Sequence, residues 1–147
     1  MRAALVWLAL TAPTAAAVNQ WNPTADLGSH GEGLRDTIGL SCATLMVLDR
    51  SAVPLRRLWC LYEVAETEAA HAGKEFLRLL APGSALSDVA RAFKTVDVAS
   101  AGCFDPKAER TIRANIVEKF GSEEAMTNKL RLLLGDILSD MVIGGAA

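Results

Sequence analysis

The sequence lacks the residue patterns that mark a metal centre or a disulfide framework. Its three cysteines, Cys42, Cys60 and Cys103, are scattered along the chain and form no CxxC pair. Only His30 and His71 could act beside them as ligands. A zinc site needs closely spaced Cys and His residues, and an odd number of cysteines cannot close a complete disulfide set. We therefore expect no metal site and reduced, mostly buried thiols.

Concentrated positive charge is also missing. The 147 residues contain 15 Lys and Arg against 17 Asp and Glu, giving a formal net charge of −2, and no basic block occurs. Nucleic acids bind where Lys and Arg build a positive field, so we expect no nucleic-acid partner. No Gly-rich phosphate-binding loop is present either. What is present is a hydrophobic content of 51%, which together with the length is typical of one packed domain, residues 1–147.

The first 17 residues allow two interpretations. One arginine, an apolar core from Ala3 to Leu10 and an Ala-x-Ala ending at Ala17 are typical of a secretory signal peptide. Alternatively, "ALVWLAL" is a buried β-strand of the domain. The segment is too short, and too interrupted by proline, to cross a membrane as a helix, so we expect no membrane span. The strand interpretation predicts a cytoplasmic protein and the signal interpretation a secreted one; the odd cysteine and the lack of an N-x-S/T acceptor favour the first.

Apolar runs alternate with helical patterns through the rest of the chain. The continuous apolar runs at 43–48 and 75–81 are typical of strands buried on both faces of a parallel sheet. A short extended segment is predicted at "TVDV", residues 95–98. Helices are expected over residues 33–39, 55–71, 84–93, 106–120 and from 123 onward, the last three capped by Ser84, Asp105 and Ser122. This alternation predicts an α/β domain with a parallel sheet.

The last helix has a clear apolar stripe. Its members recur at helical spacing and are expected to face the core: Met126, Leu130, Leu133, Leu134, Ile137 and Met141.

The helix expected over 55–71 carries the residues with most chemical interest. Trp59 and Glu63 are four residues apart, so their side chains meet on one side of the helix. The indole could shield the carboxylate from water and raise its pKa, or strengthen its field on a bound cation. Alternatively, Trp59 belongs to the core and Glu63 is a solvated surface carboxylate. Arg56 and Arg57 could contact a phosphate or remain solvated at the start of the helix.

The segment "TLMVLDRSAVPLRRLWCLYEV", residues 44–64, resembles the middle of Toll/interleukin-receptor-like (TIR-like) domains. In that family an apolar strand leads through a short loop into a helix that opens with W-C-L-x-E and an aliphatic residue. The resemblance is closest to TIR-like proteins of algae and other protists, which also share a tryptophan-bearing strand (here Trp7) and a "VNQ" segment (18–20). Matching positions in the tail are Glu109, Arg110, Ile112, Ile116, Gly121, Asn128, Arg131 and Leu134.

The resemblance implies a fold and a function. The fold would be a flavodoxin-like, TIR-like three-layer α/β domain. The sequence begins after the strand and helix that usually come first in the family, and Ala9 replaces its usual acidic residue, so we expect an N-terminally abbreviated domain that is degenerate or completes its sheet with a partner.

In active TIR domains the glutamate of the W-x-x-x-E pattern cleaves NAD at the nicotinamide–ribose bond, a role that falls here on Glu63. Trp59, Asp49 and Ser51 are the expected substrate-binding residues, since ligands bind at the carboxyl ends of parallel strands. NAD would be a substrate and not a cofactor. The alternative is a non-catalytic scaffold, or a degenerate fragment of such a domain, that associates with itself or with a TIR-like partner.

Overall fold

The computed structural model of the chain describes residues 32–71 and 76–144. The segment 1–17, with its strand and signal interpretations, lies outside the described residues. The described elements follow in the order α2 (Glu32–Leu40), β1 (Thr44–Val47), the 3₁₀ helix η1 (Val53–Arg56), α3 (Leu58–His71), β2 (Leu77–Leu80), α4 (Leu86–Lys94), α5 (Pro106–Phe120) and α6 (Glu123–Gly144).

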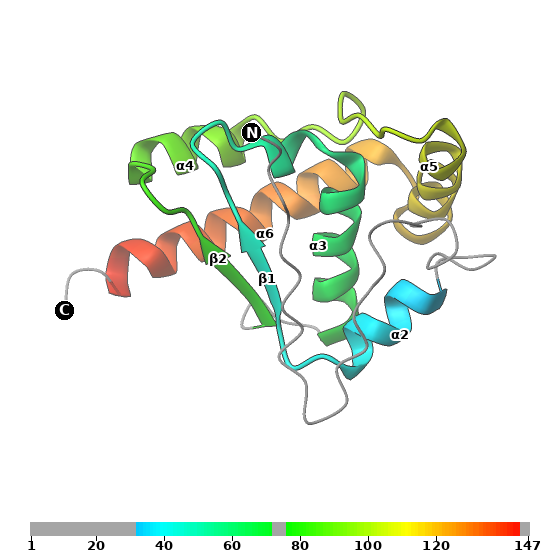
Figure 1. Cartoon of the computed structure of the whole chain (residues 1–147), viewed down its shortest axis with the longest axis horizontal. Coiled ribbons are helices and arrows are strands. Elements are labelled where there is room, and N and C mark those ends of the chain that lie inside the picture. The colour runs from blue at the N-terminus through cyan, green and yellow to red at the C-terminus, as the bar shows by residue number, and fades with distance from the viewer. Residues whose placement is uncertain (1–31, 72–75, 145–147) are drawn as a thin grey trace.

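A parallel pair of strands lies at the centre of this mostly helical α/β structure. β1 and β2 pair from Thr44 opposite Leu77 to Val47 opposite Leu80, and α3 connects them in the chain. In Figure 1, α3 runs beside the strands, while α2 and α5 lie on its side away from the strands. α6 crosses the structure and contacts α3, α4 and α5. The α/β class and the parallel pairing predicted from the sequence are confirmed.

The predicted helix over 55–71 is in two parts. η1 ends at Arg56, and α3 begins at Leu58. Between them Arg57 has an extended backbone (φ −103°, ψ 119°) and forms an isolated parallel bridge with Gly102. The Arg57 backbone is drawn out of the helix because Gly102 donates its N–H to Arg56 O, and Leu58 N–H donates to Gly102 O.

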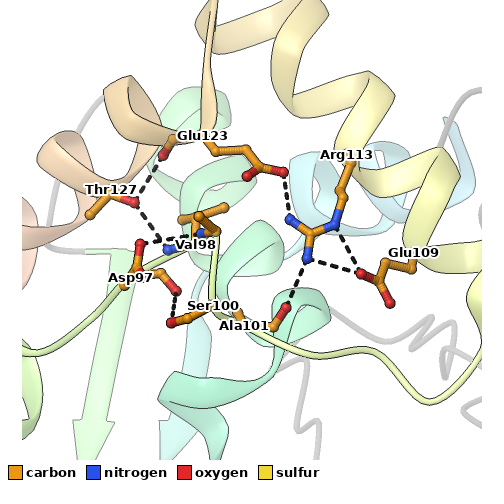
Figure 2. Close-up of polar contacts among 9 residues, drawn as sticks. Asp97, Val98, Ser100, Ala101, Glu109, Arg113, Glu123 and Thr127 are labelled. Carbon is orange, nitrogen blue, oxygen red and sulfur yellow. Dashed lines mark hydrogen bonds and ion pairs between the residues drawn. The ribbon is translucent and has the colours of Figure 1, made fainter.

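The predicted extended segment 95–98 does not form a strand. Val96 and Val98 are both buried. Side chains of α6 bind Val96 O and Val98 N–H, while nearby backbone groups bind Val96 N–H and Val98 O. Arg131 donates from Nε to Val96 O. Val98 N–H donates to Thr127 Oγ1 at 3.0 Å, as Figure 2 shows. Since these groups meet the hydrogen-bonding requirement, no neighbouring strand is needed.

The caps predicted for the last two helices are confirmed, and the cap of α4 is not. Asp105 accepts a hydrogen bond from Lys107 N–H at 2.8 Å, and Ser122 Oγ accepts from Ala125 N–H at 3.0 Å. Gly121 between them has φ +83°, a conformation that favours glycine. α4 instead begins after Ala85, which offers no side-chain cap. The hydroxyl of Ser84 is buried and has no hydrogen-bond partner among the described residues.

One core joins the strands to the helices. The predicted stripe of α6 is buried from Met126 to Ile137, and Met141 packs against it while partly exposed. The largest fully buried side chains come from α2, α3, α5, α6 and the end of β1: Ile38, Leu48, Leu58, Leu61, Tyr62, Ile112, Ile116, Met126, Leu130 and Leu134. Burying this apolar area is the main term that stabilises the arrangement.

Candidate functional site

Glu63 lies on α3, one turn after Trp59, and is only 2% exposed. The interpretation of Glu63 as a solvated surface carboxylate is therefore wrong. Trp59 is partly buried and packs against the core. Tyr62 and Val64, the neighbours of Glu63 in the sequence, are also buried, so α3 is covered on several sides at this point.

A second carboxylate of the same helix is equally buried. Glu66 is 2% exposed, and its Oε2 forms an ion pair with Lys119 Nζ of α5. One residue further, Thr67 Oγ1 donates to Glu63 O at 2.9 Å and lies 2.7 Å from Thr44 Oγ1 of β1. Polar groups of α3 thus connect this helix to both β1 and α5. Buried carboxylates are costly unless other groups stabilise them, so this pair is a distinctive feature of the structure.

Cys60 lies close enough to Glu63 to be influenced by its charge. Burial, and to a smaller extent the negative charge of Glu63, raise the pKa of the Cys60 thiol from 9.0 to about 12. A thiol with such a pKa remains protonated at neutral pH and is a poor nucleophile. Cys60 therefore contributes packing and not reactivity to this part of α3.

Asp49 and Ser51 lie together in the loop that follows β1. Asp49 Oδ1 accepts hydrogen bonds from the N–H groups of Ser51 and Val53, both at 3.0 Å. These bonds hold a tight turn in which Ala52 has a left-handed backbone (φ 50°, ψ 37°). Asp49 thus shapes the loop that leads from β1 into η1.

A cavity of about 530 Å³ opens at the carboxyl end of β1, between this loop and α4. It is lined by Arg50, Ser51, Ala52, Leu55, Arg56, Asp88, Arg91, Ala92, Thr95 and Ser100. A smaller hollow beside it shares Arg50, Ala52 and Asp88 and also reaches Asp49 and Ser84. The position agrees with the general rule for parallel sheets, where ligands bind beyond the carboxyl ends of strands.

The four residues predicted for the site are divided between two places. Ser51 lines the cavity and Asp49 the adjoining hollow, whereas Trp59 and Glu63 line neither. Arg50 and Arg91, which also line the cavity, are not among the residues predicted for the site, and for Arg56 the sequence leaves two alternatives open. Arg50 lies three residues after β1, in the loop beyond the carboxyl end of the strand, and this position could have indicated it. Arg91 could not be found, because only the packing of α4 against the loop brings it to the cavity.

Two further features bear on ligand classes. Among the described residues, no group of three or more His, Cys, Asp or Glu side chains is placed to hold a metal ion. The same part of the chain contains no helix with the length and apolar character needed to cross a membrane.

No protein-family model matches the chain, and comparisons with curated proteins and with solved structures find no significant match.

Proposed function

We propose that the chain is a TIR-like signalling module that associates with itself, with a flavodoxin-like three-layer arrangement. The observation that carries this proposal is the unit β1–η1–α3–β2. Its two strands are parallel, and the helix between them carries, directly after its first residue Leu58, the sequence Trp59, Cys60, Leu61, Tyr62 and Glu63. This is the arrangement that the resemblance to TIR-like domains implies for these residues.

Exposed apolar side chains support self-association. Phe104, directly before the N-cap of α5, is fully exposed, and Leu132 of α6 is 73% exposed. Covering an exposed phenyl ring with a second copy removes apolar surface from water, which lowers the free energy of the associated state. None of the cysteines among the described residues forms a disulfide, and this supports a cytoplasmic setting for such a module.

Light scattering coupled to size exclusion tests the association. We expect the mass of the wild-type protein to rise with concentration and that of Phe104→Ser to stay at one chain. The matched control is Leu40→Ser, which removes another exposed apolar side chain (80% exposed), at the end of α2. A wild-type mass of one chain at every concentration would exclude self-association.

NAD cleavage through Glu63 is the second candidate function, and the W-x-x-x-E pattern from Trp59 to Glu63 is the observation that favours it. Because Glu63 is 2% exposed, NAD reaches the carboxylate only if the residues that cover it move. A carboxylate shielded from water exerts a strong field, and departure of nicotinamide leaves an oxocarbenium-like ribose that such a field stabilises. Because Glu63 does not line the cavity at β1, ligand binding there and cleavage at Glu63 are separate claims that need separate tests.

The cleavage test is release of nicotinamide from NAD, followed by chromatography. We expect release by the wild type and a loss of at least about a hundredfold in Glu63→Gln, which keeps the shape of the side chain and removes its charge. The matched control is Glu118→Gln, an exposed glutamate of α5. Equal release by wild type and Glu63→Gln refutes the catalytic assignment, and absence of release from the folded wild type leaves the association module alone.

A further inference from the structure

We propose that the cavity at the carboxyl end of β1 binds a small organic phosphate, through the guanidinium groups of Arg50, Arg56 and Arg91. The three arginines come from three separate elements: the loop after β1, η1 and α4. The proposal rests on this cavity alone and does not depend on self-association or on NAD cleavage.

The charge of the lining matches a phosphate. Three arginines and one aspartate, Asp88, give the cavity a formal charge of +2, in a chain whose formal net charge is −2. A phosphate monoester carries about −1.5 to −2 at neutral pH. Arginine also binds phosphate oxygens in a bidentate manner, which gives both strength and orientation.

Two of the three guanidinium groups are available for a ligand. Neither Arg50 nor Arg56 forms an ion pair with another described residue. Arg91 pairs with Asp88 at 3.2 Å, but the two side chains are 73% and 52% exposed. An exposed pair of this kind contributes little stability, so Arg91 can exchange its partner for a phosphate at small cost.

The loop that carries Arg50 is held in place before any ligand binds. The two hydrogen bonds to Asp49 Oδ1 fix the backbone on both sides of the turn. The guanidinium of Arg50 lies against Gly83 in the turn between β2 and α4, where a Cβ atom would be 3.4 Å from Nη2. Gly83 has φ +71°, so this turn favours glycine for its backbone as well. A preorganised cation loses less entropy when it binds a ligand.

The cavity is larger than inorganic phosphate requires, and its lining residues include polar and apolar types as well as charged ones. Its volume of about 530 Å³ is in the range of small-molecule sites. Ser51, Thr95 and Ser100 line it beside apolar Leu55. The hydroxyls of Thr95 and Ser100 donate to backbone carbonyls and can still accept a hydrogen bond. In the adjoining hollow, the buried Ser84 hydroxyl has no hydrogen-bond partner among the described residues. Hydroxyls and Asp88 can bind the hydroxyl groups of a sugar, so a sugar phosphate or nucleotide fits better than inorganic phosphate.

The arrangement of the three arginines does not favour binding of a large polyanion. They converge on one concave site, whereas nucleic acids and anionic membranes require basic groups spread along a surface. The negative charge of the whole chain opposes such partners further.

Isothermal titration calorimetry with three probes tests the site: ADP, inorganic phosphate and uncharged adenosine. We expect ADP to bind, phosphate to bind more weakly and adenosine not to bind. Arg50→Gln and Arg56→Gln should each weaken ADP binding at least tenfold, since each removes a charge-assisted contact. Arg50→Lys should bind more weakly than the wild type and more strongly than Arg50→Gln, because lysine keeps the charge without the bidentate geometry.

The matched control is Arg57→Gln, which removes the same charge one residue from Arg56 but outside the cavity lining. It should bind ADP within about twofold of the wild type. Circular dichroism confirms that each variant is folded, and the exposed positions of Arg50, Arg56 and Arg57 favour this.

Three results would overturn the proposal. The first is no binding of ADP or phosphate by the folded wild-type protein. The second is equal weakening by Arg57→Gln and Arg56→Gln, which would indicate general attraction to a positive surface. The third is tighter binding of an RNA oligonucleotide or of anionic vesicles that the same two variants abolish. None of these readouts involves nicotinamide release or molecular mass, so failure here is distinguishable from failure of the proposed function.

Discussion

Lys119 of α5 forms an ion pair with Glu66 of α3, a carboxylate that is 2% exposed. The two residues are 53 positions apart in the sequence, so the pair joins helices that lie side by side only in the folded chain. Removing Lys119 would take this ion pair from the buried carboxylate of Glu66. We therefore expect Lys119→Met to lower the free energy of unfolding by about 3 kcal/mol, near the lower end for a broken buried pair because Lys119 keeps some contact with water.

Urea denaturation measures this change, with Lys107→Met as the matched control. Lys107 lies at the start of the same helix and is exposed, so its loss should change the free energy of unfolding by less than about 0.5 kcal/mol. Equal effects of the two substitutions would show that the pair with Glu66 contributes nothing to stability.

Arg113 connects three segments through one guanidinium group (Figure 2). It donates to Glu109 on its own helix at 3.0 Å, to Glu123 at the start of α6, and to Ala101 O at 3.1 Å. The hydrogen bond to Glu123 is the main cause that raises the pKa of Arg113 above its ordinary value, so the group stays charged throughout the range where the protein folds. We expect Arg113→Met to cost about 2 kcal/mol in unfolding free energy.

Arg110→Met is the control for this prediction, since Arg110 is exposed on the same helix. Arg113→Lys should recover part of the loss, because lysine retains the charge without the planar fork that contacts three acceptors. Thermal denaturation of the three variants compares them directly. Equal stability of Arg113→Met and Arg110→Met would contradict the bridging role.

The elements that the sequence predicted well are those with strong local signals. Asp105 followed by Pro106, and Ser122 followed by two glutamates, mark helix starts that depend on the chain's own neighbours. The apolar runs at β1 and β2 identify strands for a similar local reason. The prediction of a strand at "TVDV" was wrong because the conformation of this segment depends on Thr127 and Arg131, which lie about thirty residues later. Local patterns do not contain such contacts.

The site was harder to predict than the fold. Spacing placed Trp59 and Glu63 on one side of a helix, but which side faces the core depends on how α5 and α6 pack against α3. The same limit applies to the cavity. Arg91 reaches the cavity only because α4 lies against the loop after β1. The periodicity of apolar residues in the sequence does not reveal such tertiary packing. The roles of Glu63, Trp59, Asp49 and Ser51 in chemistry stay predictions.

Ala52 has φ 50° and is the one described non-glycine residue with a positive φ. A left-handed backbone costs an alanine about 1–2 kcal/mol, while glycine adopts it freely and loses more entropy on folding. We therefore expect Ala52→Gly to raise the free energy of unfolding by up to about 1 kcal/mol, measured by urea denaturation. The control is Ala85→Gly, where φ is −73° and glycine should give no gain. A loss of stability in Ala52→Gly would contradict the inference that the backbone of Ala52 is strained.

The thiol of Cys60 should be unreactive in the folded protein. Burial and the charge of Glu63 raise its pKa to about 12, so at pH 8 only about one molecule in ten thousand carries the thiolate that alkylating reagents need. Cys42 is exposed and should react much faster. Peptide mass spectrometry after a short exposure to iodoacetamide measures both rates, and guanidinium chloride provides the control in which Cys42, Cys60 and Cys103 should react alike.

The same shift predicts how stability depends on alkaline pH. The unfolded thiol loses its proton near pH 9, whereas the folded thiol keeps it until about pH 12. Between these values the unfolded state binds fewer protons, so the contribution of Cys60 to stability is present below pH 9 and falls as pH rises towards 12. Cys60→Ala lacks this group, and its free energy of unfolding should decline less steeply than that of the wild type between pH 9 and 10.5. Parallel slopes for the two proteins would show that the Cys60 thiol titrates equally in both states.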